Sequence, residues 1–173
     1  MKQLFKLFAV TGLILTAFTA SAQQPAKKAP ASPADTVKGT TKGGVAIEVA
    51  YSQPAVKGRS IGNDIAPYGK VWRTGANNAT TITLSKDIKV EGKALAAGQY
   101  AIYSIPGEKE WVIIFNKGVK NWGTKYEESE DVLRVTVKTG KTKEFVERFK
   151  FAVEPAGKVS FSWGDKLVAF AVK

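Results

Sequence analysis

The segment from Tyr51 to Asn78 gathers polar and aromatic side chains of the kinds that bind a ligand through hydrogen bonds and flat apolar contacts. It shows little of the alternation of a β-strand, and long irregular segments on a rigid scaffold commonly carry binding residues. Aromatic rings offer flat surfaces to sugar rings, whereas guanidinium, amide and carboxylate groups supply the donors and acceptors that hydroxyl groups need. The candidate binding residues of this segment are Arg59, Asp64, Tyr68, Trp72, Arg73, Asn77 and Asn78.

A second aromatic pair, Trp122 and Tyr126, lies in the stretch NKGVKNWGTKYEE and is a candidate for the opposite wall of the same site. A structural role is the alternative throughout. Trp72 is then a core aromatic whose indole is satisfied, Arg73 holds the loop to nearby acids, and the two asparagines only favour a tight turn before Thr80. Residue types and spacing leave both interpretations open.

The chain contains no histidine and no cysteine, which removes most familiar catalytic and metal-binding arrangements. Serine–histidine–aspartate hydrolysis, thiol nucleophiles, and zinc or copper sites built on imidazole or thiolate are excluded. Phosphate-binding and dinucleotide-binding glycine motifs are absent as well, so we expect no metal and no cofactor. The remaining catalytic option is a carboxylate pair acting on a glycoside, with Glu48, Asp64, Glu147 and Asp165 as candidates. The sequence leaves enzymatic activity uncertain.

Residues 1–22 have the features of a secretory signal peptide. Two lysines flank the start of an apolar run from Leu7 to Phe18, and Ala20-Ser21-Ala22 supplies the small residues of a cleavage site. The run is shorter than the ~20 residues that cross a membrane. We therefore expect cleavage after Ala22, no transmembrane anchor in the mature protein, and a location in the periplasm or outside the cell.

Residues 23–44 are rich in alanine, proline, lysine, threonine and glycine and contain no aromatic residue. Such a composition buries too little apolar surface to offset the entropy lost on ordering the chain. It predicts a flexible linker before a single domain at residues 45–173.

The chain carries 26 Lys and Arg residues against 15 Asp and Glu residues, a net charge of +11. Only four of these basic residues are arginine, and the lysines are scattered rather than clustered. Nucleic-acid binders usually show a basic stripe in which arginine is prominent. We therefore expect a solvated lysine surface, no nucleic-acid partner, and at most a weak attraction to anionic envelope polymers.

From residue 45 onward the hydrophobic period is two, which is typical of β-strands. Turn residues, most often glycine, separate the alternating runs. The predicted strands are 45–51, 81–85, 99–105, 110–116, 132–138, 144–153, 158–163 and 166–172, with one helical turn near 126–131. Roughly eight to nine short strands without a 3.6-residue period predict an all-β fold, an antiparallel β-sandwich of jelly-roll-like form.

Two runs break the simple alternation. Residues 111–115, WVIIF, are apolar at every position, which predicts a central strand covered on both faces. In residues 144–153 a regular alternation would place Glu147 on the apolar face beside Phe149. Either a bulge after Val146 turns the carboxylate outward, or the carboxylate is buried with an arginine partner. We favour the bulge because it leaves no charge inside.

Much of the domain resembles a family of secreted bacterial proteins. The most specific part of the resemblance is the string YGKVWRTGAN, residues 68–77. It extends to YSQPAVKGRSIG before this string and to KDIKVEGKALAAGQYAIYSIP and EWVIIFNK after it. This family is known only as domain of unknown function 2911, and the resemblance extends from Val45 to about Phe161. It implies a signal peptide and a predominantly β domain, without any activity or ligand. Gln53 stands where many relatives are expected to have a basic residue, so a contact with an anionic ligand at that position would be missing here.

These observations together predict a non-catalytic module that binds a carbohydrate or another polymer of the bacterial envelope. Two alternatives from other classes stay open. One is a glycan-cleaving hydrolase that uses a carboxylate pair, and the other is a structural or assembly protein of the cell envelope.

Overall fold

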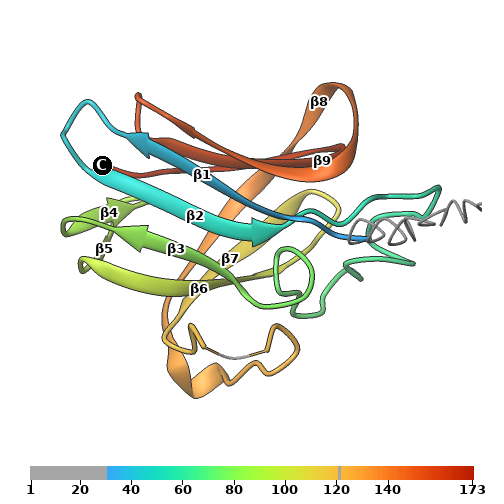
Figure 1. The fold of residues 1–173 in the computed structure, drawn as a ribbon, viewed down its shortest axis with the longest axis horizontal. Coiled ribbons are helices and arrows are strands. Elements are labelled where there is room, and N and C mark those ends of the chain that lie inside the picture. Colours follow the sequence, from blue (N-terminus) through green and yellow to red (C-terminus); the bar gives the residue numbers. More distant parts are fainter. Residues whose placement is uncertain (1–30, 121) are drawn as a thin grey trace, which may run out of the picture.

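Nine β-strands make up most of the regular structure in the computed structural model, which describes residues 31–120 and 122–173. Seven of them form one antiparallel sheet in the order β1-β2-β3-β6-β7-β8-β9, and β4 and β5 form a separate hairpin (Figure 1). The strands are β1 (Ala34–Thr40), β2 (Ala46–Ser52), β3 (Thr80–Leu84), β4 (Ile88–Val90), β5 (Lys93–Leu95), β6 (Gly98–Ile105), β7 (Glu110–Asn116), β8 (Asp131–Glu154) and β9 (Lys158–Ala171). The predicted all-β, antiparallel fold is confirmed.

A single 3-10 turn, Glu128–Glu130, is the one helical element of the described residues, and it lies where the sequence predicts a helical turn. The described part of the chain therefore has no helix of the length and apolarity that a membrane crossing requires. The predicted signal peptide, residues 1–22, and the first eight residues of the predicted linker, 23–30, lie outside the described residues.

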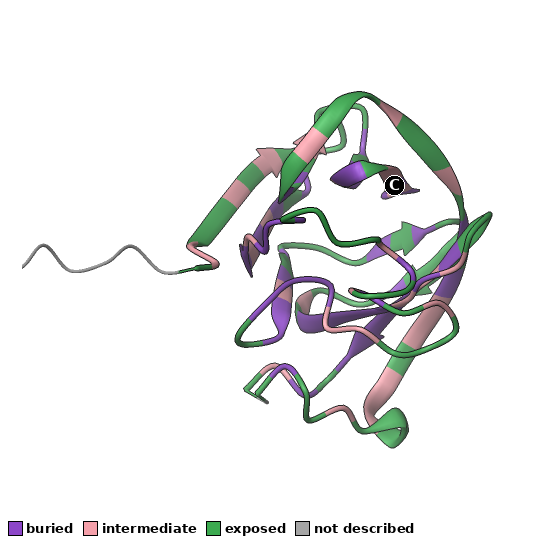
Figure 2. Ribbon diagram, turned by 90° about the vertical axis from the view of Figure 1, so that its right-hand side faces the viewer, coloured by how far each residue is buried: buried purple, intermediate pink, exposed green. Residues whose placement is uncertain are grey.

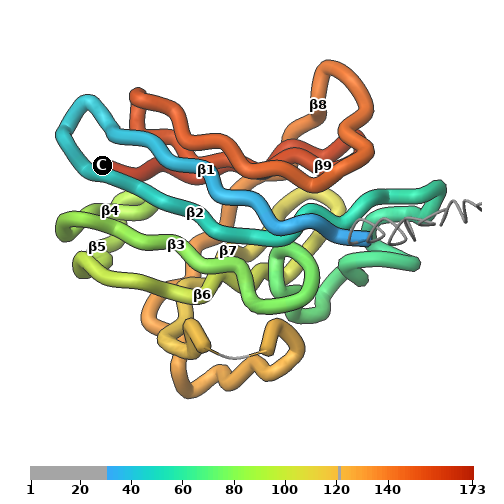
Figure 3. The backbone as a smooth tube through the Cα atoms, in the orientation of Figure 1, coloured from blue at the N-terminus to red at the C-terminus, as the bar shows by residue number. Residues whose placement is uncertain are grey.

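The long strand β8 joins the two layers of the fold. Its first residues, 131–138, pair with β7, whereas residues 139–141, 146 and 150–154 pair with β9. β8 therefore runs from the lower layer of Figure 1, with β2, β3, β6 and β7, to the upper layer, as the tube in Figure 3 also shows. At the far side, β1 packs on the end of β8, because a Cβ atom on Gly39 would lie 2.6 Å from Cγ1 of Val153. The sheet thus curls around a single interior.

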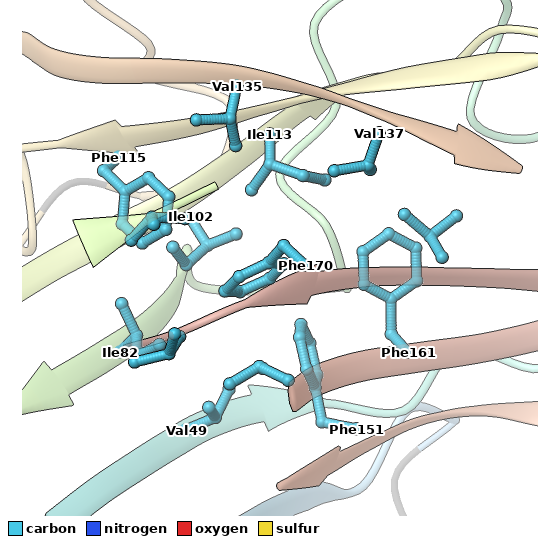
Figure 4. Close-up of a cluster of buried hydrophobic side chains, with 14 of the residues drawn as sticks. Val49, Ile82, Ile102, Ile113, Phe115, Val135, Val137, Phe151, Phe161 and Phe170 are labelled. Carbon is cyan, nitrogen blue, oxygen red and sulfur yellow. The ribbon is translucent and has the colours of Figure 1, made fainter. Parts of the chain in front are cut away.

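That interior is filled by the inward-facing side chains of both layers (Figure 4). Figure 2 shows the buried residues along the inside of the curled sheet and the exposed residues along its outside. Strand β7 is covered on both faces, as its sequence predicts. Trp111, Ile113 and Phe115 belong to the main core, and Ile114 packs with Tyr103 in a second cluster on the opposite face.

Strand β8 contains the predicted bulge. Its register against β9 shifts between Lys141 and Val146 and again between Val146 and Lys150. Glu147 is exposed as a result, and its carboxylate accepts a hydrogen bond from the backbone N–H of Lys57 at 2.9 Å. Phe149 then returns to the core and is fully buried. The bulge interpretation is confirmed, and no buried partner for Glu147 is needed.

Strand β1 is the main departure from the sequence-based expectation, because it lies within the segment predicted to be a flexible linker. It pairs with β2 along its whole length, from Ala34 opposite Ser52 to Thr40 opposite Ala46. Its side chains are mostly exposed, and only Val37 packs partly against the core. The ladder with β2 therefore orders β1, which composition alone does not reveal because strand formation depends on the neighbouring strand.

Candidate functional site

Two irregular segments meet at one end of the sheet. One is the polar segment, residues 68–78, which leads into β3, and the other is the loop of residues 117–127, which connects β7 to the 3-10 turn. Asn78 and Trp122 pair across them as an isolated antiparallel bridge. The Trp122 side chain is 58% exposed. The structure therefore brings two of the predicted site residues side by side and presents a flat aromatic surface to solvent.

The end of the polar segment is a tight turn held by buried hydroxyl groups. Thr74 and Asn77 both have positive φ, at 51° and 60°, a conformation that asparagine tolerates better than most residues. The Thr74 hydroxyl donates to Ser104 Oγ at 2.9 Å, and the Thr80 hydroxyl donates to the Thr74 carbonyl at 2.8 Å. Asn77 Nδ2 donates to Ser52 Oγ at 3.3 Å. These bonds fix the turn and leave Asn78 exposed beside β2.

A groove of about 290 Å³ lies along β1, β2 and β3 next to this turn, and we call it the Asn78 groove. Hydroxyl, amide and carboxylate groups line it together with an apolar side chain from the 117–127 loop. The lining residues that matter here are Asp35, Thr36, Ser52, Asn78, Thr81 and Val119. The groove thus offers both donors and acceptors of hydrogen bonds.

Asp35 is the anchored carboxylate of the Asn78 groove. Its Oδ2 accepts hydrogen bonds from the Tyr51 hydroxyl at 2.7 Å and from Gln53 Nε2 at 2.9 Å. Its Oδ1 accepts from the backbone N–H of Thr36 at 2.8 Å. Burial of the Tyr51 ring, followed by the hydrogen bond to Asp35, raises the pKa of Tyr51. Gln53 therefore orients this carboxylate with a neutral amide.

Arg73 packs against the 117–127 loop at Gly123. Its Cδ lies where a Cβ atom on Gly123 would be, so the alkyl chain packs directly on that glycine. Its Nε is buried and, within residues 31–120 and 122–173, has no hydrogen-bond partner. A buried N–H group normally has a hydrogen-bond partner, which a protein group, an ordered water or a ligand supplies.

Trp72 packs against the hydrophobic core, as the structural interpretation of this segment predicts. Its ring stacks on Trp163 with centroids 5.3 Å apart and planes 5° apart, and it meets Trp111 and Phe149 edge to face at 6.0 and 5.4 Å. Its backbone pairs with Ser104 through hydrogen bonds of 2.7 and 2.8 Å. One face of the ring is therefore covered by Trp163, and a contact between Trp72 and a ligand stays a prediction.

The other three residues predicted in the first half of the segment contact their own loop. Arg59 donates to the carbonyls of Val56 and Ala55 at 3.1 and 2.8 Å. Asp64 accepts from the backbone N–H and hydroxyl of Ser60, and these hydrogen bonds lower the pKa of Asp64. The Tyr68 ring covers Gly62, which has a φ of 99°. These contacts shape the loop of residues 55–68, and ligand binding by Arg59, Asp64 and Tyr68 stays a prediction.

Tyr126 braces the far end of the 117–127 loop. Its ring packs against Tyr103 with centroids 4.9 Å apart. Its hydroxyl donates to Asp131 Oδ2 at 2.7 Å and accepts from Arg134 Nη2 at 2.7 Å. Arg134 also pairs with Glu128 at 2.8 Å. Tyr126 thus supports the loop that carries Trp122 and ties this loop to the start of β8.

Burial, together with the hydrogen bond to Asp131, raises the pKa of Tyr126 from 10.0 to about 12. Because the pKa is higher in the folded state, the stabilisation from this phenol is complete below pH 10 and is lost as the pH rises through 12. We expect spectrophotometric titration of tyrosinate to show a late-ionising tyrosine near pH 12 that is missing in Tyr126→Phe. An unchanged titration curve for the variant would contradict this assignment.

Gly123 is required for the close approach of the two segments. A Cβ atom there would lie 2.6 Å from the Asn77 carbonyl oxygen and would also overlap Arg73. We expect Gly123→Ala to push the loop away and to destabilise the protein by about 1–3 kcal/mol, with a red shift of Trp122 emission. Gly43→Ala is the control, because its nearest contact would be an ordinary 3.6 Å. Equal melting temperatures for the two variants would refute the tight packing.

The four carboxylates considered for catalysis each have a different local partner. Glu48 pairs with Lys38 at 2.8 Å and Asp165 with Lys166 at 3.2 Å. Glu147 and Asp64 accept hydrogen bonds from Lys57 and Ser60. In the described part of the chain, no group of three or more His, Cys, Asp or Glu residues is placed to hold a metal ion. Catalysis by a carboxylate pair stays a prediction without an observation in its favour.

Most of the groove residues that the sequence does not indicate come from strands, and Val119 comes from the 117–127 loop. Asp35 and Thr36 lie in β1, inside the predicted linker, and Thr81 belongs to the polar face of a predicted strand. The only signal for β1 is the short run DTVKGT, in which valine and threonine favour a strand.

The chain was compared with protein-family models, with curated proteins and with solved structures. A family model described as "Protein of unknown function (DUF2911)" matches residues 32–172. No curated protein and no solved structure matches the chain. The matched range includes β1, the Asn78 groove and the 117–127 loop, and it covers most of the 173 residues. The chain therefore belongs to the DUF2911 family.

Proposed function

We propose that this protein is a non-catalytic binding module of the periplasm or the cell exterior, and that it binds a carbohydrate or another envelope polymer in the Asn78 groove. The pairing of Asn78 with Trp122 carries the proposal, because it places the exposed Trp122 next to a residue that lines a polar groove. Ligand sites commonly combine apolar or aromatic surface with a few placed polar groups.

The groups in and beside the groove suit a sugar. A pyranose ring has C–H groups on its faces and hydroxyl groups around its edge. Trp122 offers a flat surface for a face, and the Asp35 carboxylate, the Asn78 amide and the Thr36 and Thr81 hydroxyls offer acceptors and donors for the edge. The volume of about 290 Å³ is just below the ~300–1,000 Å³ typical of ligand pockets. It suits a short unit of a polymer whose remainder passes over Trp122.

The proposal is tested by binding of the purified protein to a panel of neutral envelope and plant polysaccharides, with release of reducing ends measured in parallel. We expect saturable binding to at least one polymer, competition by its short oligosaccharides, and no release of reducing ends. Folded protein that binds no member of the panel would contradict the binding function. Release of reducing ends would instead favour the carboxylate-pair hydrolase.

A further inference from the structure

The middle of β8 departs from β9 and forms an arch, residues 141–150, which we call the β8 arch. Between its two register shifts only Val146 pairs with β9, opposite Gly164. The β8 arch is the turn that protrudes at the upper right of Figure 3. It encloses a groove of about 750 Å³ against β9. This groove is separate from the Asn78 groove, and the two share no lining residue.

The β8 arch groove carries an excess of positive charge. Lys141, Lys143, Arg148 and Lys150 line it, against the carboxylates of Glu144 and Glu147. Within residues 31–120 and 122–173 none of the four cations forms a salt bridge; the pairs found there involve Lys38, Arg134, Lys158 and Lys166. Glu147 is already engaged by the Lys57 N–H. The three lysines of the groove are therefore free to pair with an anionic ligand, whereas Arg148 Nη1 already donates to the carbonyls of Ala31 and Gln53, both at 3.4 Å.

The same groove contains an exposed aromatic ring. Phe145 is 63% exposed, and a Cβ atom on Gly164 would lie 3.6 Å from its Cε2. The ring lines the groove and lies against Gly164 of β9, so it is directed toward β9 rather than away from the protein. A side chain that anchors a protein in a lipid surface has to project outward. This position favours a ligand that enters the groove over a membrane surface that lies across the β8 arch.

We infer that the β8 arch groove is a second binding site, and that its ligand is an acidic polysaccharide of the uronate type. Its carboxylates pair with Lys141, Lys143, Lys150 and Arg148, and a sugar ring packs on Phe145. Carboxylates suit both lysine and arginine, and the arginine fork can hold a carboxylate through two hydrogen bonds. The inference does not depend on the Asn78 groove, because it uses different residues and a different ligand charge.

Binding of the full protein to polygalacturonate at low salt tests the inference, with neutral dextran and anionic phosphatidylglycerol vesicles as comparison ligands. We expect Lys141→Glu/Lys143→Glu to weaken polygalacturonate binding about tenfold or more, because two attractive ion pairs become repulsive. The matched control, Lys86→Glu/Lys89→Glu, makes the same charge change on exposed lysines at and next to β4. It is expected to change the affinity less than threefold.

Phe145→Ala separates ring packing from charge alone, and we expect it to weaken polygalacturonate binding several-fold. Equal losses in the two lysine double variants would overturn the inference, since net charge would then explain the binding. An unchanged affinity in Phe145→Ala, or binding to phosphatidylglycerol vesicles but not to polygalacturonate, would overturn it as well. Neutral polysaccharides that bind near Trp122 are unaffected by these variants, so failure here is distinguishable from failure at the Asn78 groove.

Discussion

Phe149→Ala is expected to destabilise the protein by about 3–5 kcal/mol, the range measured for large-to-small substitutions of buried phenylalanine. Phe149 is fully buried where the β8 arch returns to the core. Its ring lies within about 6 Å of five aromatic neighbours, which are Tyr51, Phe151, Phe161, Trp72 and Trp163. The variant leaves a cavity at the centre of the aromatic core, and it loosens the support beneath Trp72.

Urea denaturation followed by circular dichroism gives the free energy of unfolding for this test. Phe145→Ala is the matched control, because it removes the same ring four residues earlier in β8 from a position that is 63% exposed. We expect the control to change the free energy of unfolding by less than about 0.5 kcal/mol. Similar losses for the two variants would mean that β8 follows a regular alternation, without the bulge that separates the two rings.

Trp122→Ala is expected to weaken polysaccharide binding about 30-fold while it leaves the fold intact. Truncating an aromatic residue at the centre of a binding surface commonly costs 2 kcal/mol or more, and ~1.4 kcal/mol corresponds to a factor of ten. Trp122 belongs to neither hydrophobic core cluster. Its removal therefore costs little stability, in contrast to Trp111 or Trp163, which are buried.

Isothermal titration with the polymer identified in the panel measures this loss. Val132→Ala is the control, because Val132 is another exposed apolar side chain, at 38% exposure, and it lies in β8 away from the Asn78 groove. The control is expected to bind as the unaltered protein does. Equal affinities for Trp122→Ala and the unaltered protein would remove the indole from the site.

Much of the sheet is predictable because alternation reports which face of a strand is buried. The prediction for residues 110–116 matches β7, and the out-of-phase Glu147 correctly indicates a bulge. The predicted strands 132–138 and 144–153 are parts of the single strand β8, and 158–163 and 166–172 are parts of β9. The glycines between them indicate turns in the sequence, but glycine within a strand also permits a bend without ending the strand. Strand β1 was not predicted, since its order comes from pairing with β2 rather than from its own apolar residues.

The candidate site is less predictable, because it depends on contacts between residues distant in sequence. Spacing does not reveal that Asn78 pairs with Trp122, or that Asp35 from β1 lines the same groove as Asn78. A tryptophan at position 72 is equally compatible with a surface that stacks on a ligand and with a core residue. Only the structure shows that its ring stacks on Trp163. A glycine such as Gly123 can indicate that another segment packs closely against the backbone. The sequence does not show that this segment contains Arg73 and Asn77, which only the fold reveals.

The central claim, that a ligand bound in the Asn78 groove also covers the neighbouring Trp122, is tested most directly by acrylamide quenching of tryptophan fluorescence. The chain has four tryptophans, of which Trp111 and Trp163 are buried and Trp122 is the most exposed. A saturating oligosaccharide is predicted to lower the quenching constant of the unaltered protein and to leave that of Trp122→Phe unchanged. Oligosaccharide binding that leaves the quenching of Trp122 unaltered would contradict the claim and would place the ligand elsewhere on the protein.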